Sequence, residues 1–343
     1  MKAFDDIQKV LQTPQRVIIT THHKPDGDAM GSSLAWGHYL KKKGHQVHVI
    51  TPSDYPEFLN WLPGNEEVIV FSQQTKERIQ KHINESTLIC CLDFSSLARI
   101  ETIREMVEKS TARKLVIDHH LDPEPFADIT YWDVKAAATC ELIYELIEQF
   151  GDVDSIDSTI GTCIYTGIMT DTSSFRHPST TKKVHEIAGV LIEKGINTSA
   201  IHRLIYDNNS ENRLRLLGYV LLEKIIILPE YKTAYVALTA AELKRFDSKT
   251  GDTEGLVNFL LSIKNIVLAV ILIDRTEAVK LSFRSIGDFS VNSLSKNHFS
   301  GGGHKNAAGG ISHESLEKTV EKFLSVLPLY KEQLDQLNKD QLC

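Results

Sequence analysis

Cysteine is scarce in this 343-residue sequence, and no two cysteines stand in CxxC spacing. The five that occur are odd in number, which argues against a zinc ribbon or a disulfide framework and favours a reducing compartment. The first twelve residues, MKAFDDIQKVLQ, lack the apolar segment of a signal peptide. The longest strongly apolar run, residues 266–273, is far shorter than the ~20 residues that a membrane helix needs. We therefore expect a soluble, cytoplasmic protein that does not bind a membrane.

The sequence also lacks an excess of positive charge. It contains 38 Lys and Arg residues against 45 Asp and Glu residues, which gives a formal net charge of −7. Proteins hold long nucleic acids largely through cationic side chains that release counterions, so a long duplex is not an expected partner. Hydrophobic residues make up 42% and charged residues 24%, as in ordinary globular proteins, which excludes disordered and fibrous classes. The length predicts roughly two domains.

The first half of the chain alternates short apolar runs with segments of helical periodicity. Buried strands are expected in five runs, at 16–21, 46–51, 67–71, 87–93 and 114–118. Helices are expected between them, at 29–44, 75–83 and 97–109. This alternation predicts an α/β fold with a parallel, doubly wound sheet and helices on both of its faces.

Strand-like runs disappear between about 136 and 223, where successive segments have helical periodicity. They return in the C-terminal third, at 225–228, 233–238, 265–273 and 278–285. We therefore expect three parts in the chain. They are a large α/β domain at 1–195, a helical connector at 196–224 and a smaller α/β domain at 225–343.

Residues suited to metal binding or acid–base chemistry follow three of the predicted strands. They are His22, Asp26 and Asp28 after the first strand, Asp93 after TLICCL, and Asp118, His119 and His120 after KLVI. Ligands bind at the carboxyl ends of the strands in a doubly wound sheet, so these side chains should share one edge, and Asp171 joins them from the helical region. Each has an ordinary alternative: Asp26 in a turn, Asp93 as a helix cap, Asp171 in solvent.

Carboxylates packed together at one sheet edge repel each other unless cations lie between them. Four carboxylates and two neutral imidazoles carry a charge that two divalent cations would balance. These candidate ligands are His22, Asp26, Asp28, Asp93, His119 and Asp171. Oxygen and imidazole ligands without thiolate favour Mn²⁺, with Mg²⁺ as the alternative, and Asp93 is the expected bridge between the ions. Such a pair supports phosphoryl displacement by activated water. The residues alone do not decide between His22 and His23.

Four segments, HHKPDGDAMGS, CLDFSSLAR, IDHH and TDTSSF, stand in the order and near the spacings of the motifs of the DHH phosphoesterase superfamily, which the chain resembles. The resemblance implies the six ligands named above and selects His22 over His23. It also implies that His120 faces the scissile phosphate and acts in catalysis together with Asp93. Ser173 departs from the pattern, because relatives commonly have glycine there, and this bears on the local backbone.

The segment FSGGGHKNAAGG at 299–310 places three consecutive glycines before a histidine. Such a backbone can turn its N–H groups inward to bind an anion, while a plain hairpin loop explains the glycines alone. The string resembles the GGGH motif of the small DHH-associated domain. That resemblance implies substrate-binding roles for Gly301, Gly302, Gly303, His304 and Arg284. Arg99, six residues after Asp93, is a further candidate for substrate contact, with an ordinary surface arginine as the alternative.

Chains of this length that carry both motifs resemble the NrnA-type branch of the superfamily. The resemblance implies metal-dependent hydrolysis of short oligoribonucleotides of 2–5 nucleotides, linear dinucleotides among them, and of 3′-phosphoadenosine 5′-phosphate (pAp). The alternatives are a non-catalytic RNA- or nucleotide-binding module and a phosphatase chiefly specific for pAp. A homodimer is compatible with these functions. Trp36, Trp61 and Trp132 are expected to pack in hydrophobic cores.

Overall fold

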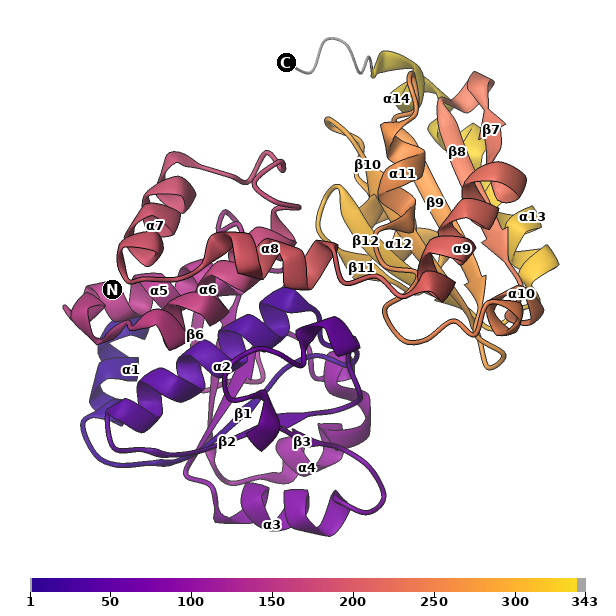
Figure 1. Ribbon diagram of the computed structural model, residues 1–343. Helices are drawn as coiled ribbons and strands as arrows, with labels where there is room; N and C mark the ends of the chain where they lie inside the picture. Colours follow the sequence, from indigo (N-terminus) through magenta and orange to yellow (C-terminus); the bar gives the residue numbers. More distant parts are fainter. Residues whose placement is uncertain (1, 338–343) are drawn as a thin grey trace. The chain divides into compact units, whose positions relative to one another are not determined.

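A computed structural model describes residues 2–337 of the chain. The chain forms two compact units that divide between Asn208 and Asn209, and each unit is described by itself (Figure 1). Within the described residues, no helix combines the length and the apolar character needed to cross a membrane.

The first unit is built on a six-stranded sheet whose strands all run parallel. In spatial order the strands are β3 (Ile69–Val70), β2 (Gln46–Thr51), β1 (Arg16–Thr20), β4 (Leu88–Leu92), β5 (Arg113–Asp118) and β6 (Ile129–Trp132). The chain builds outward from β1 to β3 and then returns to the other side of β1 with β4. In doubly wound sheets, ligands bind beside the strands where this order reverses. The predicted parallel, doubly wound α/β fold is confirmed.

Helices cover both faces of this sheet, because its central strands are apolar on both sides. Val17 and Ile19 of β1 face one hydrophobic core, while Ile18 between them faces the other. The first core is shared with α1 (Lys2–Leu11), α2 (Gly27–Lys42), α5 (Thr139–Gln149), α6 (Ser158–Asp171), α7 (Lys182–Glu193) and α8 (Thr198–Tyr206). The second core is shared with α3 (Lys76–Glu85) and α4 (Arg104–Lys109).

Some elements of the first unit differ from the sequence prediction. The strand expected at 67–71 is reduced to β3, because a 3₁₀ helix occupies Asn65–Glu67. The helix expected at 97–109 is divided into a 3₁₀ segment (Leu97–Ile103) and α4, because the backbone at Glu101 leaves the helical region with φ of 31°. Strand β6 was not predicted, since its four residues form a strand through pairing with β5.

The second unit contains a mixed six-stranded sheet (Figure 1). In spatial order its strands are β11 (Gly302–Gly303), β12 (Ala307–Ser312), β10 (Val279–Ser285), β9 (Leu268–Asp274), β8 (Thr233–Leu238) and β7 (Ile226–Leu228). Strands β8 and β9 are parallel, and the other described pairs are antiparallel. The helices are α9 (Glu211–Tyr219), α10 (Ala240–Arg245), α11 (Leu256–Ser262), α12 (Val291–His298), α13 (Leu316–Val326) and α14 (Lys331–Gln336). This is the smaller α/β arrangement that the sequence predicts.

The segment expected as a helical connector, 196–224, consists of α8, α9 and a π-helical turn at Val220–Lys224. The division between the two units falls inside this segment. Ile201 and Ile205 place α8 in a core of the first unit, whereas Leu216 places α9 in a core of the second.

Candidate metal centre

Three neighbouring strands carry predicted ligands just beyond their carboxyl ends. His22 follows β1, Asp93 follows β4 and His119 follows β5, and these three strands are adjacent in the sheet. All three side chains are buried. Asp93 has a positive φ of 64°, a conformation that is uncommon for residues other than glycine and that recurs at functional sites. The parallel topology therefore gathers these residues at one edge.

Asp93 lies between the two imidazoles and presents one carboxylate oxygen to each. Its Oδ2 is 3.4 Å from Nε2 of His22, and its Oδ1 is 3.6 Å from Nε2 of His119. The sequence predicts Asp93 as the bridge between two cations. A carboxylate with one oxygen toward each ligand group has the geometry that a bridge requires.

The first ligand group consists of His22, Asp26 and Asp93, whose ligand atoms lie within 4.8 Å of one another. Asp26 is the N-cap of α2, and its Oδ1 accepts hydrogen bonds from the backbone N–H groups of Asp28 and Ala29. Its Oδ2 lies 3.9 Å from Nε2 of His22. One carboxylate thus caps the helix and still offers an oxygen to the centre.

His22, rather than His23, faces this group. Nδ1 of His23 lies 3.4 Å from Oε2 of Glu101, and the backbone N–H of His23 donates to the carbonyl of Arg99. Of the two histidines that the residues alone did not separate, the structure therefore places His22 beside Asp93 and His23 beside Glu101.

The second ligand group consists of Asp28, His119 and Asp171. Nε2 of His119 lies 3.8 Å from Oδ2 of Asp28 and 3.4 Å from Oδ2 of Asp171. Asp28 is buried in the first turn of α2, whereas Asp171 is the last residue of α6 and is partly exposed. Helix termini, as well as strand ends, therefore supply this group.

Backbone carbonyls hold both imidazoles in the orientation that a metal ligand needs. Nδ1 of His22 lies 2.9 Å from the carbonyl oxygen of His23, and Nδ1 of His119 lies 3.0 Å from that of Ala136. A proton on each Nδ1 donates to the carbonyl and leaves Nε2 as the lone-pair nitrogen, directed at the carboxylates. This arrangement fits a divalent cation in each group.

Thr139 contacts two predicted ligands but was missed by sequence reasoning. Its Oγ1 donates to Oδ1 of Asp93 at 2.9 Å, and its backbone N–H donates to Oδ2 of Asp28 at 2.6 Å. The next backbone N–H, of Cys140, donates to Oδ1 of Asp28 at 2.9 Å. The N-terminus of α5 therefore holds Asp28 in place. The helical pattern that begins at about 136 was the available signal, but the approach of this helix to the sheet edge depends on tertiary packing.

The pKa values in the centre reflect burial and crowded negative charge. Burial, followed by the nearby carboxylates of Asp28 and Asp26, raises the pKa of Asp93 well above its usual value. Burial and the Arg99 guanidinium lower the pKa of His22 to about 4, which keeps it neutral near pH 7. A divalent cation binds the neutral form of an imidazole and stabilises the ionised form of a buried carboxylate. Both pKa shifts are therefore those expected of a metal site without its metal.

His120 and Arg99 flank the ligands. Nδ1 of His120 lies 2.8 Å from Oδ1 of the buried Asp118 and 3.7 Å from Oδ1 of Asp93. Although burial raises the pKa of Asp118, its hydrogen bond to His120 and the charge of His120 lower it overall. This ion pair fixes the His120 ring beside the centre. Arg99 is half-buried, and its charge lowers the pKa of His22, so the guanidinium lies near the first group.

The predicted substrate-binding residues of the second unit lie on β10 and a β11–β12 hairpin. A guanidinium nitrogen of Arg284, on β10, donates to the carbonyl of Phe283. The backbone N–H of His304 donates to the Ala307 carbonyl at 2.7 Å, which closes the hairpin and takes this N–H from any anion nest. The hairpin that the sequence offered as an alternative is the structure present, and Gly303 adopts φ of 139° within it.

The three glycines have different surroundings. A methyl group on Gly301 would collide with the carbonyl of Gly309 and the hydroxyl of Ser295. On Gly303 it would lie 2.6 Å from the Ala307 carbonyl oxygen. On Gly302 its nearest neighbours would be Oδ1 of Asn292 at 3.6 Å and Cε of Lys296 at 3.7 Å, which are ordinary contact distances. Gly301 and Gly303 are thus required by the fold, and Gly302 is not.

Comparison with known proteins agrees with this arrangement. Residues 16–168 match the N-terminal domain of the DHH family, and residues 231–330 match the DHHA1 domain. The crystal structure of an exopolyphosphatase-related protein from Bacteroides fragilis is 40% identical to this chain, covers 98% of each chain and superposes with a TM-score of 0.91. The chain belongs to the DHH family.

This DHH protein is also similar to two bacterial enzymes, each named bifunctional oligoribonuclease and PAP phosphatase NrnA. The enzyme of Thermus thermophilus is 29% identical over 329 residues, which cover 95% of this chain and 93% of that protein. The enzyme of Bacillus subtilis is 27% identical over 294 residues, which cover 85% of this chain and 88% of that protein. The chain is an NrnA-type DHH phosphoesterase.

Ser173, where the sequence resemblance leads us to expect glycine, lies in a left-handed turn. Its φ is 48°, and Ser174 and Phe175 also have positive φ values, so the chain turns through three left-handed residues after Asp171. Glycine adopts this conformation at no steric cost, whereas serine is strained in it. The Thr172 hydroxyl accepts a hydrogen bond from the Phe175 backbone N–H, which supports the turn.

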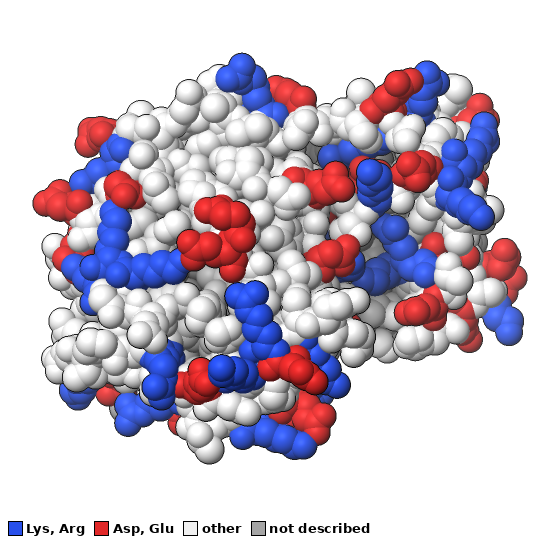
Figure 2. Space-filling model, turned by 60° about the horizontal axis from the view of Figure 1, so that its bottom comes forward, with Lys and Arg blue, Asp and Glu red and all other residues white. Residues whose placement is uncertain are grey.

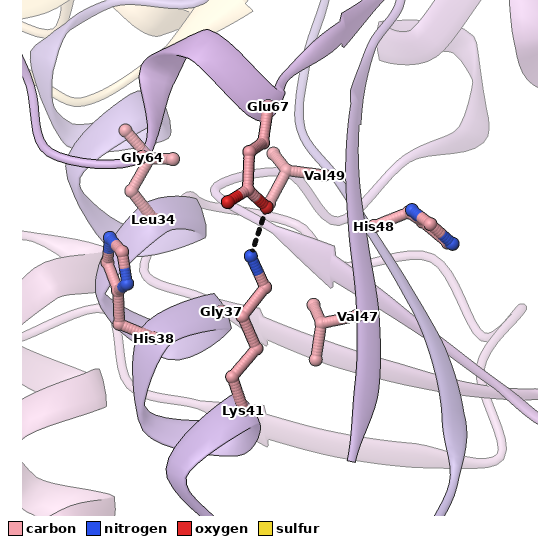
Figure 3. A pocket seen from close by; sticks show the side chains of 9 residues that line it. All are labelled: Leu34, Gly37, His38, Lys41, Val47, His48, Val49, Gly64 and Glu67. Carbon is pink, nitrogen blue, oxygen red and sulfur yellow. Dashed lines mark hydrogen bonds and ion pairs between the residues drawn. The ribbon is translucent and has the colours of Figure 1, made fainter.

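A small cavity of about 20 Å³ lies elsewhere in the first unit, between α2 and β2 (Figure 3). Lys41 and Glu67 form an ion pair of 2.5 Å at this cavity, while the His48 ring points away from the other side chains drawn. It contains none of the predicted ligands. The cavity has room for little more than water, so it does not compete with the sheet edge as a nucleotide site.

Proposed function

We propose that this DHH protein hydrolyses short oligoribonucleotides of 2–5 nucleotides, linear dinucleotides among them, and pAp, with two divalent cations at the sheet edge. The single observation that carries the proposal is the placement of Asp93, with one oxygen toward His22 and the other toward His119. The names of the NrnA relatives, oligoribonuclease and PAP phosphatase, support these substrate classes.

The proposed ligands divide between two cations. His22 and Asp26 would hold one, Asp28, His119 and Asp171 the other, and Asp93 both. Four carboxylates and two imidazoles favour Mn²⁺, with Mg²⁺ as the alternative. When bound, such a pair lowers the pKa of water and stabilises negative charge on a phosphoryl group under attack.

The remaining residues of the centre would bind and orient the substrate. His120, held by Asp118, would donate a hydrogen bond to a phosphoryl oxygen or to the leaving group. Arg99 would add positive charge next to the first ligand group. In the second unit, Arg284, His304 and the glycines at 301–303 would bind a terminal phosphate that is not cleaved.

Local recognition of this kind suits the charge of the protein. On the face shown in Figure 2, Lys and Arg side chains are interspersed with Asp and Glu side chains. The net charge of −7 gives little general attraction for a long polyanion, so affinity would come from a few contacts at the site. Short substrates would gain as much from these contacts as long ones.

One assay tests the proposal. The full-length protein, stripped of metal, is supplied with Mn²⁺ or Mg²⁺ and then with pAp and a ladder of short RNAs. We expect metal-dependent turnover of pAp and of 2–5-nucleotide RNA, abolished by EDTA. Binding of both without turnover would identify a non-catalytic nucleotide-binding module, and turnover of pAp alone would identify a pAp phosphatase. Either outcome overturns the proposal.

A further inference from the structure

The sequence predicts that Trp132 packs in a hydrophobic core. In the structure its side chain is instead 39% exposed at the end of β6. Trp36 is fully buried and Trp61 packs against the first core of the unit, so the expectation holds for the other two tryptophans. An exposed aromatic side chain forgoes the free energy that its burial would contribute. Trp is enriched at binding interfaces, because its ring offers apolar surface while its N–H group forms a hydrogen bond. The surroundings of Trp132 indicate which partner it would bind.

The indole lies beside the candidate metal centre. Trp132 and Asp118 are register partners in the parallel pair β5–β6, so their side chains leave the same face of the sheet. Asp118 in turn holds the ring of His120. The Trp132 Nε1–H also donates to the carbonyl oxygen of His120 at 2.7 Å. The ring is therefore anchored by its polar edge one residue away from the ligand His119.

This anchoring leaves the π-system for contact with a ligand. The indole has one hydrogen-bond donor, and His120 accepts it, so the exposed part of the ring offers only apolar and π surface. Nucleobases stack on aromatic faces of this kind whatever their sequence, at a gain of roughly 1–3 kcal/mol per base. A phosphate, by contrast, gains nothing from that surface.

We propose that Trp132 is a stacking platform for a nucleobase of the substrate, next to the phosphate that His120 contacts. This inference rests on the proposed function, which it extends by a base-recognition element in the first unit. Stacking is tolerant of base identity, so the platform would give affinity for nucleotides over other phosphate esters without preference among the four bases.

Fluorescence offers a test that does not depend on turnover. The full-length protein with Mg²⁺ is titrated with 5′-AMP and, as a matched probe, with ribose 5-phosphate, which has the same sugar and phosphate but no base. We expect 5′-AMP to quench the indole emission and ribose 5-phosphate to leave it unchanged. The quenching should disappear in Trp132→Phe and persist in Trp61→Phe. Quenching that survives in Trp132→Phe, or that ribose 5-phosphate produces equally, would overturn the proposal.

Kinetics separate stacking from support of His120. Trp132→Phe removes the N–H donor and keeps an aromatic face, whereas Trp132→Leu removes both. Stacking predicts that KM for the dinucleotide pApA rises roughly 5- to 150-fold in Trp132→Leu and stays close to wild type in Trp132→Phe. An equal fall of kcat in both variants, with KM unchanged, would show that the indole only positions His120. If the wild-type protein hydrolysed neither pApA nor pAp, the proposed function would fail, while the 5′-AMP titration would still decide on the platform.

Discussion

In the first unit, the candidate ligands come from the ends of three adjacent parallel strands and from two helix termini. In the second unit, the candidate substrate-binding residues come from one hairpin and from the strand β10 beside it. The first site consists of buried carboxylate and imidazole side chains that hydrogen bonds to the backbone hold in place. The second depends largely on the absence of side chains, at Gly301 and Gly303.

We expect substitutions to affect the two sites differently. At the sheet edge, removal of one side chain takes away charge or a hydrogen bond and leaves the backbone intact, so chemistry is lost before the fold is. In the hairpin, a methyl group added at Gly301 or Gly303 meets a backbone carbonyl, so stability is lowered before any specific contact is lost. Variants in each unit test this contrast.

The largest effect is expected from Asp93→Ala. It removes the carboxylate that faces both ligand groups, so metal binding in both should weaken. Activity on every substrate should fall at least about a thousandfold, which corresponds to ~4 kcal/mol of transition-state stabilisation. Metal analysis should find fewer than two ions per chain, while Glu77→Ala, an exposed carboxylate on α3, should behave as wild type. Two tightly bound ions and activity within about tenfold of wild type would disprove the bridge.

The sequence predicts this site well because its chemistry follows from topology. β1, β4 and β5 are apolar runs, and the rule that ligands bind at their carboxyl ends predicts that Asp93, His119 and one of the two histidines after β1 lie together. The choice of His22 over His23 came from the resemblance to the DHH superfamily. Thr139 and Trp132 could not be placed in this way. Their roles depend on where α5 begins relative to Asp28 and on the register of β6 against β5, which are set by tertiary packing.

The hairpin was harder to predict for a different reason. The residues AAGGIS of β12 have little strand propensity, and they form a strand because β10 and β11 pair with them on both sides. The glycine run indicated a binding loop, but its spacing did not reveal which glycines the fold requires. That distinction comes from Ser295 and the Gly309 carbonyl, which lie against Gly301.

The next largest effect is expected from Arg284→Ala and His304→Ala in the second unit. If these residues bind a terminal phosphate that is not cleaved, kcat/KM for 5′-phosphorylated di- and trinucleotides should fall about ten- to a hundredfold, or roughly 1.5–3 kcal/mol. Bis(p-nitrophenyl) phosphate has no such terminal phosphate, so its hydrolysis should change little. Equal losses on both substrates would mean that the residues support the fold instead.

A pair of glycine substitutions should separate fold from binding in the hairpin. Gly301→Ala should lower the free energy of unfolding by about 1–3 kcal/mol, because its methyl group meets the Gly309 carbonyl. Gly302→Ala should keep the stability of the wild type, because its methyl group has ordinary contacts with Asn292 and Lys296. Urea denaturation measures both. Equal stability of the two variants would contradict the division of roles among the glycines.

The smallest effect is expected from Thr139→Val, which keeps the shape of the side chain and removes the hydroxyl that donates to Asp93. The backbone N–H that holds Asp28 remains, so only one hydrogen bond around the centre is lost. Removal of a group that hydrogen-bonds to a metal ligand typically lowers metal affinity about ten- to a hundredfold. We expect about tenfold here, because only one hydrogen bond is lost. Titration of the metal-free variant with Mn²⁺ should show this decrease, and saturating Mn²⁺ should restore most of the activity. Thr139→Ser keeps the hydroxyl and should bind Mn²⁺ as the wild type does. If Thr139→Val and Thr139→Ser bound Mn²⁺ equally well, the hydroxyl would have no part in orienting Asp93, and the helix N-terminus alone would hold the centre.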